Sequence, residues 1–211
     1  MKQIDMKQAE LTDLAKKGRI SRRDFMAKAT AMGVTAALAT SVWNNSAQAA
    51  PKRGGTMRFG SGHGSTTDTL DPGTFANGGI IHQGYGMRNH LTEVNNDGTL
   101  IPELSEGWEA SDDASEWVFN LRKGVEFHNG KSLEPQDVID SINHHRGKDS
   151  KSAAKPLLAA ITELKADGKD KVVFKLSGGN ADFPFTVSDY HLAIMPSKGN
   201  GKVDWQSGIG T

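Results

Sequence analysis

The sequence predicts a mixed α+β fold in which short antiparallel strands outnumber helices. Apolar and polar residues alternate in several short runs, and in the clearest, 117–121, this places Trp117, Phe119 and Leu121 on one face. Asp-Gly and Asn-Gly pairs follow several of these runs, and such pairs are typical of hairpin turns. One helix with an apolar side begins near Pro135, where the missing N–H of proline has no intrahelical partner.

The expected elements follow one another closely, with most connections short enough for hairpins. The helices are expected at 80–91, from 135 to the residues His144, His145 and Arg146, and near 181–188. The turns are expected at 95–98, 112–113, 122–124, 129–130 and 166–168. The strands are expected at 56–60 with Met57 and Phe59 on one face, at 92–94, at 104–110 with Trp108 as a buried anchor, and at 117–121, 172–176 and 192–195.

The first 49 residues read as an export signal. A polar segment leads to Ser21, Arg22, Arg23 and Phe25, an arrangement that resembles the twin-arginine export motif. A weakly apolar stretch follows, and it closes with small residues at Ala47 and Ala49, as a signal peptidase requires. We therefore expect a signal peptide at 1–49, export through the twin-arginine translocase and a mature domain at 50–211.

A membrane anchor is the alternative for this segment. The apolar part, residues 29–43, is 15 residues long and contains three threonines, one serine and one glycine. A stable span needs about 20 strongly apolar residues. The segment also lacks a cysteine that could carry a lipid, because the chain has no cysteine at all. We therefore expect a free, exported periplasmic protein.

The charge of the expected mature domain excludes a nucleic-acid-binding role. Residues 50–211 hold 17 of the 25 basic and 21 of the 25 acidic side chains, a net charge of −4. A nucleic-acid-binding surface has to be basic to displace counterions from the phosphates. The absence of cysteine also excludes disulfides, thiolate metal sites and a cysteine nucleophile.

Several segments of the mature part resemble one family of exported receptors. The run 117–130, WVFNLRKGVEFHNG, is similar almost residue for residue to a signature of the solute-binding proteins that serve dipeptide, oligopeptide and nickel ABC importers. The segments 55–60, 69–72, 95–109 and 137–138 are similar to further motifs of that family. The resemblance covers residues 54–211. It implies a periplasmic-binding-protein-like type II fold, a small solute such as a peptide as ligand, and ABC permease subunits in the inner membrane as partners.

Members of that family are about three times as long as the mature part of this chain. The end of the sequence, 208–211, resembles a motif that lies well before the second lobe of the family. The resemblance therefore implies a fragment that contains the first part of lobe I with its inserted subdomain, and that lacks the second lobe. A truncated, inactive gene product is one alternative to a working receptor.

The loop after the first expected strand is the expected ligand-binding element. Glycines allow backbone groups to approach a ligand, and hydroxyls donate or accept hydrogen bonds to a peptide main chain. An ordinary solvated loop is the alternative. The expected substrate-binding residues are Gly62, His63, Gly64, Ser65, Thr66 and Thr67.

The remaining polar candidates are expected to be structural. His128 should fix a hairpin turn, and Asp112 and Asp113 should form a turn rather than a catalytic pair. His144 and His145 are adjacent on a helix and point about 100° apart, so they do not easily share a metal ion. We therefore expect no metal, no cofactor and no catalytic residue.

No hydrolase or phosphate-binding motif occurs in the sequence. The first hypothesis is therefore a binding receptor without chemistry of its own. The alternative is a periplasmic hydrolase that uses serine or histidine and aspartate groups. Turnover of a peptide or an ester distinguishes the hydrolase, since a receptor shows only saturable binding.

Overall fold

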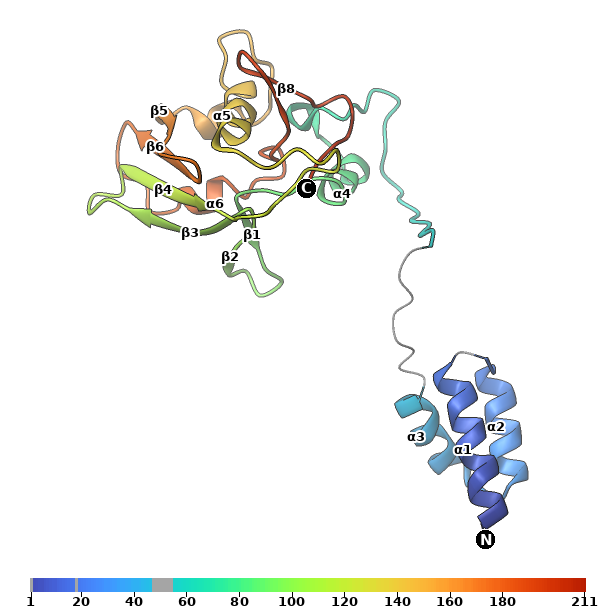
Figure 1. The fold of residues 1–211 in the computed structure, drawn as a ribbon. Helices are drawn as coiled ribbons and strands as arrows, with labels where there is room; N and C mark the ends of the chain where they lie inside the picture. The colour runs from blue at the N-terminus through green and yellow to red at the C-terminus, as the bar shows by residue number, and fades with distance from the viewer. Residues whose placement is uncertain (1, 18, 47–54) are drawn as a thin grey trace. The chain divides into compact units, whose positions relative to one another are not determined.

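The computed structural model describes residues 2–17, 19–46 and 55–211. The chain divides into two compact units, Met1–Phe59 and Gly60–Thr211. The described part of the first unit contains only helices, and the second carries the sheets (Figure 1). The expected boundary after residue 49 concerns proteolytic cleavage, so it stays a prediction.

Three helices pack together in the first unit: α1 (Lys2–Lys16), α2 (Arg22–Ala31) and α3 (Ala36–Ser46). Gly33 lies between α2 and α3 with a φ of +81°, which a residue with a side chain rarely adopts. The apolar stretch is thus split into two short helices. No helix of the described residues has the length and apolarity to cross a membrane.

The centre of the second unit is a four-stranded antiparallel sheet with the order β3-β4-β6-β5. Its strands are β3 (Ser105–Ala110), β4 (Glu116–Leu121), β5 (Ile161–Ala166) and β6 (Lys171–Leu176). The register places Phe119 of β4 opposite Trp108 of β3 and Val172 of β6. The predicted strands in these regions and the turns between them are confirmed.

Aromatic side chains fill the core on one face of this sheet. Trp117, Phe119 and Leu121 are all buried, as the alternation predicts. The ring of Phe119 meets that of Phe174 edge-on, with 5.4 Å between the ring centres, a geometry that aromatic pairs favour. Trp108 packs against this core, as predicted, but it is only partly buried.

Helix α5 (Pro135–His144) covers the core (Figure 1). Proline occupies its first turn as predicted, and Val138 and Ile142 are buried. The short 3-10 helix η2 (Lys155–Leu158) leads from α5 toward β5, and α6 (Phe183–Thr186) places Phe183 in the same core.

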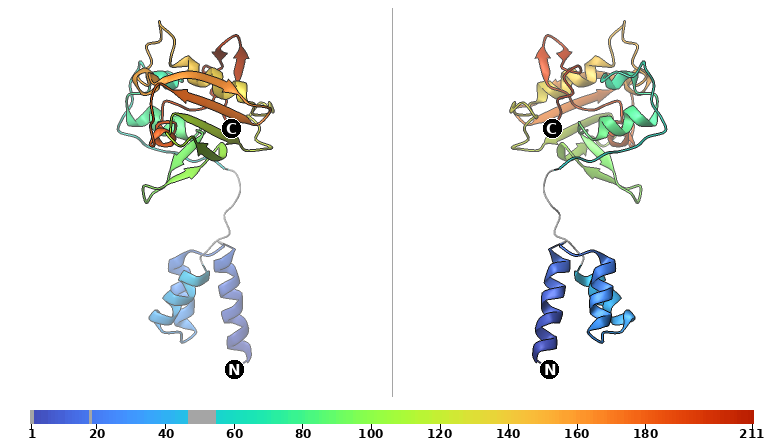
Figure 2. Two further views of the ribbon diagram at one scale, coloured as in Figure 1. Left: turned by 90° about the vertical axis from the view of Figure 1, so that its left-hand side faces the viewer. Right: turned by 90° about the vertical axis from the view of Figure 1, so that its right-hand side faces the viewer.

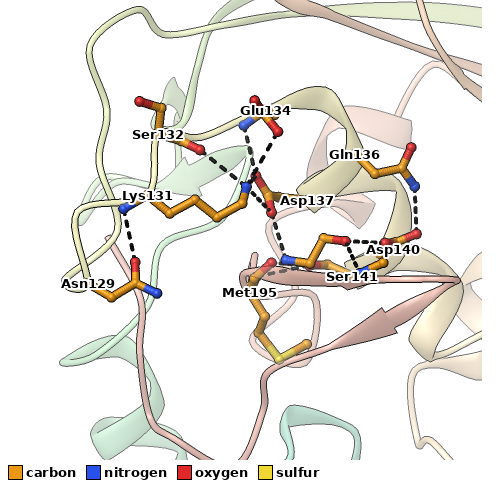
Figure 3. A network of polar contacts seen from close by, with 11 residues as sticks. Asn129, Lys131, Ser132, Glu134, Gln136, Asp137, Asp140, Ser141 and Met195 are labelled. Atoms are coloured by element: carbon orange, nitrogen blue, oxygen red, sulfur yellow. Dashed lines mark hydrogen bonds and ion pairs between the residues drawn. The ribbon is translucent and has the colours of Figure 1, made fainter.

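A buried polar network fixes the start of α5 (Figure 3). The Asp137 carboxylate is fully buried and accepts hydrogen bonds from Lys131 Nζ at 2.6 Å, from the Glu134 N–H at 2.9 Å and from the Ser197 N–H at 2.7 Å. A buried charge is tolerated when it is paired and hydrogen-bonded in this way. The network therefore ties the turn before α5 to the segment that follows the core.

Two small hairpins and one further helix complete the second unit. β1 (Thr92–Val94) pairs with β2 (Leu100–Pro102) through the predicted turn, in which Gly98 has a φ of +83°. Figure 2 shows this hairpin projecting from one end of the unit. β7 (Ser197–Gly199) and β8 (Lys202–Val203) form a hairpin that was not predicted. The helix α4 (Gly78–Tyr85) follows the 3-10 helix η1 (Pro72–Thr74) and is shorter than expected.

Two of the predicted strands do not form. Residues 56–60 belong to no strand, and Met57 and Phe59 are 86% and 66% exposed. Residues 192–195 are buried, yet the Ile194 N–H donates to a loop carbonyl and the Met195 N–H to a side-chain hydroxyl. A strand forms only where a neighbouring strand pairs with its main-chain groups, and the alternation or apolarity of one segment does not show whether such a neighbour exists.

Arg88, just after α4, is 1% exposed and joins three distant segments. Its guanidinium donates to the carbonyl of Leu70 at 2.7 Å, to that of Trp205 at 2.7 Å and to that of Ile209 at 3.4 Å. The close approach at the C-terminus needs a glycine, since a Cβ on Gly210 would lie 1.9 Å from the Met87 carbonyl oxygen. The last residues thus lie beside the end of α4 (Figure 1).

Candidate functional site

A small cavity of about 190 Å³ lies between η1 and the end of α5. The aspartate that caps η1 and the last residue of α5 face each other across it. Its lining residues are Asp71, Gly73, Thr74, His144, Ser150, Lys151 and Ser152. Hydroxyl, imidazole, ammonium and carboxylate groups thus surround one opening, an arrangement that suits a polar solute.

Asp71 and His144 form the central pair of this cavity. His144 Nε2 lies 2.8 Å from Asp71 Oδ1, and the Gly73 N–H donates to the same oxygen at 2.9 Å. Burial raises the pKa of Asp71, but the hydrogen bond and charge of His144 outweigh it and hold this pKa below its usual value. The carboxylate is therefore ionised at neutral pH and already partnered.

His145 lies behind this pair and is fully buried. Its Nδ1 is 2.7 Å from Ser152 Oγ, and its Nε2 has no hydrogen-bond partner among the described residues. Burial, reinforced by the charge of His144, lowers the pKa of His145 from 6.5 to about 3. The neutral ring shares this hydrogen bond with the Ser152 hydroxyl, and Ser152 Oγ also accepts one from the Ala154 N–H at 3.1 Å.

This serine–histidine pair is poorly suited to hydrolysis. A general base works best when its pKa lies near the operating pH. An imidazole with a pKa of about 3 is a very weak base at neutral pH. The interpretation of His144 and His145 as residues of the helix end is confirmed, since His144 ends α5 and His145 is its C-cap. Among the described residues, no cluster of ligands could hold a metal ion.

The predicted binding loop comes a few positions before Asp71 in the sequence, but none of its residues lines the cavity. All six of its residues, 62–67, are exposed. The loop is held against the start of α4, because the Ser65 N–H and Asn77 Nδ2 both donate to the Asp68 carboxylate at 2.7 Å. A Cβ on Gly79 would lie 2.2 Å from the His63 carbonyl oxygen, so this contact requires glycine.

Within the loop, hydroxyls and main-chain groups remain near the surface. Ser65 Oγ and Thr67 Oγ1 bond to each other at 2.8 Å, and Ser61 Oγ donates to the His63 carbonyl at 3.2 Å. The loop is thus shaped by local hydrogen bonds and anchored at Asn77, which also caps α4. It presents Gly62, Gly64 and Thr66 to solvent.

His128 is structural, as expected, but its partner is not the turn. Its main-chain N–H donates to the Gly210 carbonyl at 2.8 Å, and its Nδ1 accepts from the Gly210 N–H at 3.2 Å. The histidine therefore ties the hairpin end to the C-terminal residues. The predicted turn at Asp112 and Asp113 is confirmed, with Asp113 accepting from serine hydroxyls on both sides.

The residues of the expected export signal lie in different surroundings. Arg22 and Arg23 are exposed in the first turn of α2, and Phe25 is 2% exposed. Ser21 caps this helix by accepting a hydrogen bond from the Asp24 N–H at 3.1 Å. The expected cleavage residues Ala47 and Ala49 lie outside the described residues.

Residues 99–211 match the family model described as bacterial extracellular solute-binding proteins, family 5, middle part. The HTH-type transcriptional regulator SgrR of Yersinia enterocolitica is 29% identical over 138 residues, which are 65% of this chain and 24% of that protein. The uncharacterized protein YhjP of Bacillus subtilis is 34% identical over 102 residues, 48% of this chain and 17% of that protein. The chain thus spans about a quarter or less of the length of these curated relatives.

Solved structures share the same fold. The binding protein AgaA from A. tumefaciens R10, in complex with agropinic acid, has a TM-score of 0.58 at 25% identity, over 61% of this chain and 26% of that one. OppA of Haemophilus influenzae, in complex with the peptide RPPGFSPFR, has a TM-score of 0.59 at 17% identity, over 67% and 32%. The predicted fold of the type II periplasmic binding proteins is confirmed. Because the family model also matches more than half of its residues, the chain belongs to the family 5 bacterial extracellular solute-binding proteins.

Proposed function

We propose that this chain is part of the substrate-binding component of an ABC importer, which captures a peptide in the periplasm and delivers it to permease subunits in the inner membrane. Membership of family 5 supports solute binding. Two structural neighbours, DppA of Helicobacter pylori and OppA of Haemophilus influenzae, hold a bound peptide, and this supports a peptide as the solute. The chain spans only part of its relatives, so the complete receptor is proposed to close a second lobe over the ligand.

The observation that carries this proposal is the polar cavity at Asp71 and His144, with the exposed loop 62–67 next to it in the chain. A peptide presents amide donors and acceptors along its length, and each one that is buried needs a partner. The loop offers main-chain groups and the Thr66 hydroxyl, and the cavity offers Lys151 and Ser152. We propose that the loop binds the main chain of the solute.

The proposed receptor has no catalytic step. His145 is too weak a base to activate Ser152 at neutral pH, which argues against the hydrolase. Incubation of the intact protein with the peptides that it binds, followed by mass spectrometry, distinguishes the two functions. We expect to recover the peptides without cleavage. More moles of cleaved peptide than of protein would instead show that the protein is a hydrolase.

We also propose that residues 1–49 direct export through the twin-arginine translocase. The exposed pair Arg22 and Arg23 at the start of α2 supports this, because such a pair is accessible to a receptor. Cleavage after Ala49 would then release the periplasmic protein. Changing both arginines to lysine is expected to leave the precursor in the cytoplasm, and normal export of that variant would contradict the route.

Isothermal titration calorimetry with short peptides tests binding, on the intact protein encoded by the full reading frame. Saturable binding is expected, and Thr66→Val should weaken it about fivefold, the loss of roughly one hydrogen bond. Thr162→Val on β5 is the matched control and should leave the affinity unchanged. Equal affinity for Thr66→Val and the unchanged protein would exclude the loop from the binding surface.

A further inference from the structure

The described part of the first unit buries one residue of the export motif while it exposes the two others. Arg22 and Arg23 are exposed, but Phe25, only two residues further, is 2% exposed. Its ring lies against that of Trp43 in α3, with 5.2 Å between the ring centres. A partner that binds all three side chains together can therefore contact only the arginines while this unit is folded.

Part of the cover over Phe25 comes from the polar leader before the motif, beside the Trp43 ring of α3. Leu11 and Ala15 of α1 are 5% and 3% exposed and belong to the same apolar cluster as Phe25 and Ala29 of α2. Positions 11 and 15 lie one turn apart on a helix and so share one face. The leader thus has an apolar stripe that matches the buried face of α2.

This packing is weak enough to open. Among the residues whose burial the structure describes, the buried cluster holds five, and three of them are alanines. A cavity of about 320 Å³, lined in part by Leu11 and Phe25, lies within the unit. Units of this size are marginally stable, and low-stability units open locally without global unfolding.

The helix dipole adds a second source of instability at the motif itself. Arg22 and Arg23 occupy the first turn of α2, where the partial positive charge of the helix N-terminus disfavours cations. Asp24 in the same turn offsets part of this repulsion. The two arginines therefore lower the stability of the folded unit at the motif itself.

We propose that α1 is an autoinhibitory cover over the export signal, and that Phe25 becomes accessible only when α1 separates from α2. The inference rests on the proposed export function. The exposed arginines allow a first contact with an acidic receptor surface, and the release of Phe25 is a second, slower step. The fraction of open units then limits the rate of export, as the population of a competent state limits apparent affinity.

Substitution of the buried face of α1 tests this proposal in the full-length chain. Ala15→Gln places a larger polar side chain in the cluster, and Ala37→Gln makes the same change at an exposed position of α3 in the same unit. Pulse-chase export measures the function, and hydrogen exchange of the peptide 22–31 in the purified precursor measures the opening. Ala15→Gln should accelerate both by about threefold or more, and Ala37→Gln should change neither.

Two outcomes would contradict the proposal that α1 covers the export signal. Unchanged exchange of residues 22–31 in Ala15→Gln would show that α1 does not protect α2. Faster exchange with export at the original rate would show that opening does not limit the process. The double change of Arg22 and Arg23 to lysine in the Ala15→Gln background separates this test from the proposed route, because normal export of that variant contradicts the twin-arginine function itself.

Discussion

Lowering the pH from 7 to 5 should destabilise the second unit through His145. This imidazole is fully buried and its pKa is held at about 3, against 6.5 in the unfolded chain. Between these two values the unfolded state binds more protons than the folded state. The stability that the neutral His145 contributes is therefore fully present above pH 6.5, and it is lost as the pH falls from 6.5 toward 3.

The magnitude follows from the two pKa values. Protonation of the unfolded chain alone lowers the free energy of unfolding by about 1.4 kcal/mol for each pH unit below 6.5. Between pH 7 and pH 5 the loss amounts to about 2 kcal/mol. With an m-value of about 2 kcal/mol per molar urea, the midpoint of unfolding should fall by about 1 M.

Urea unfolding followed by tryptophan fluorescence at both pH values measures this loss. The variant His145→Gln removes the titrating group, so its midpoint should depend much less on pH, although it starts from a lower stability. The exposed His63 of the loop 62–67 provides the control, and His63→Gln should retain the pH dependence of the unchanged chain. A loss in His145→Gln as large as that of the unchanged chain would refute the assignment of a neutral, buried imidazole.

Three further substitutions test the packing of the second unit. Arg88→Met removes a buried guanidinium that donates to three main-chain carbonyls, and it should cost about 3 kcal/mol in urea unfolding. The exposed Arg122→Met should cost less than about 1 kcal/mol. Phe119→Ala should cost about 3 to 5 kcal/mol by leaving a cavity in the aromatic core, and the half-exposed Phe185→Ala provides the comparison. Gly210→Ala should displace the C-terminal residues from α4, and faster amide exchange at positions 208–211 would report it, because no room exists for the added Cβ. Unchanged stability of Arg88→Met, equal losses for the two phenylalanines, or unchanged exchange in Gly210→Ala would contradict these assignments.

Local signals account for the parts of the fold that were predicted. The strand 117–121 has its apolar residues at a spacing of two, the strand 172–176 begins with an apolar run, and turn residues lie a few positions from each. The signals for each strand therefore lie within a few residues of it. The start of α5 is marked by Pro135 in the same local way. The three helices before residue 47 were not predicted, because polar helices that share a small alanine-rich cluster carry little apolar periodicity.

The candidate site could not be predicted from local sequence signals, because its residues are far apart in the sequence. His144 and Asp71 meet across 73 residues, and nothing in either segment alone marks the pair. The glycines and hydroxyls of 62–67 did indicate an exposed loop, and the structure places that loop where its composition suggests. The burial of His145 depends on the tertiary packing of α5, and only packing gives it a pKa far from that of an exposed histidine.

The contacts of Arg88 also set an order of events during synthesis. Its partner carbonyl at Ile209 is made 121 residues later, and at about 5 to 20 residues per second that delay is roughly 6 to 24 s. During this time the guanidinium stays hydrated. The segment before η1 then lacks the full set of contacts that holds Arg88 against the Leu70 carbonyl. Closure of the second unit therefore waits for the synthesis of residue 209, which gives chaperones and proteases a defined interval in which to act.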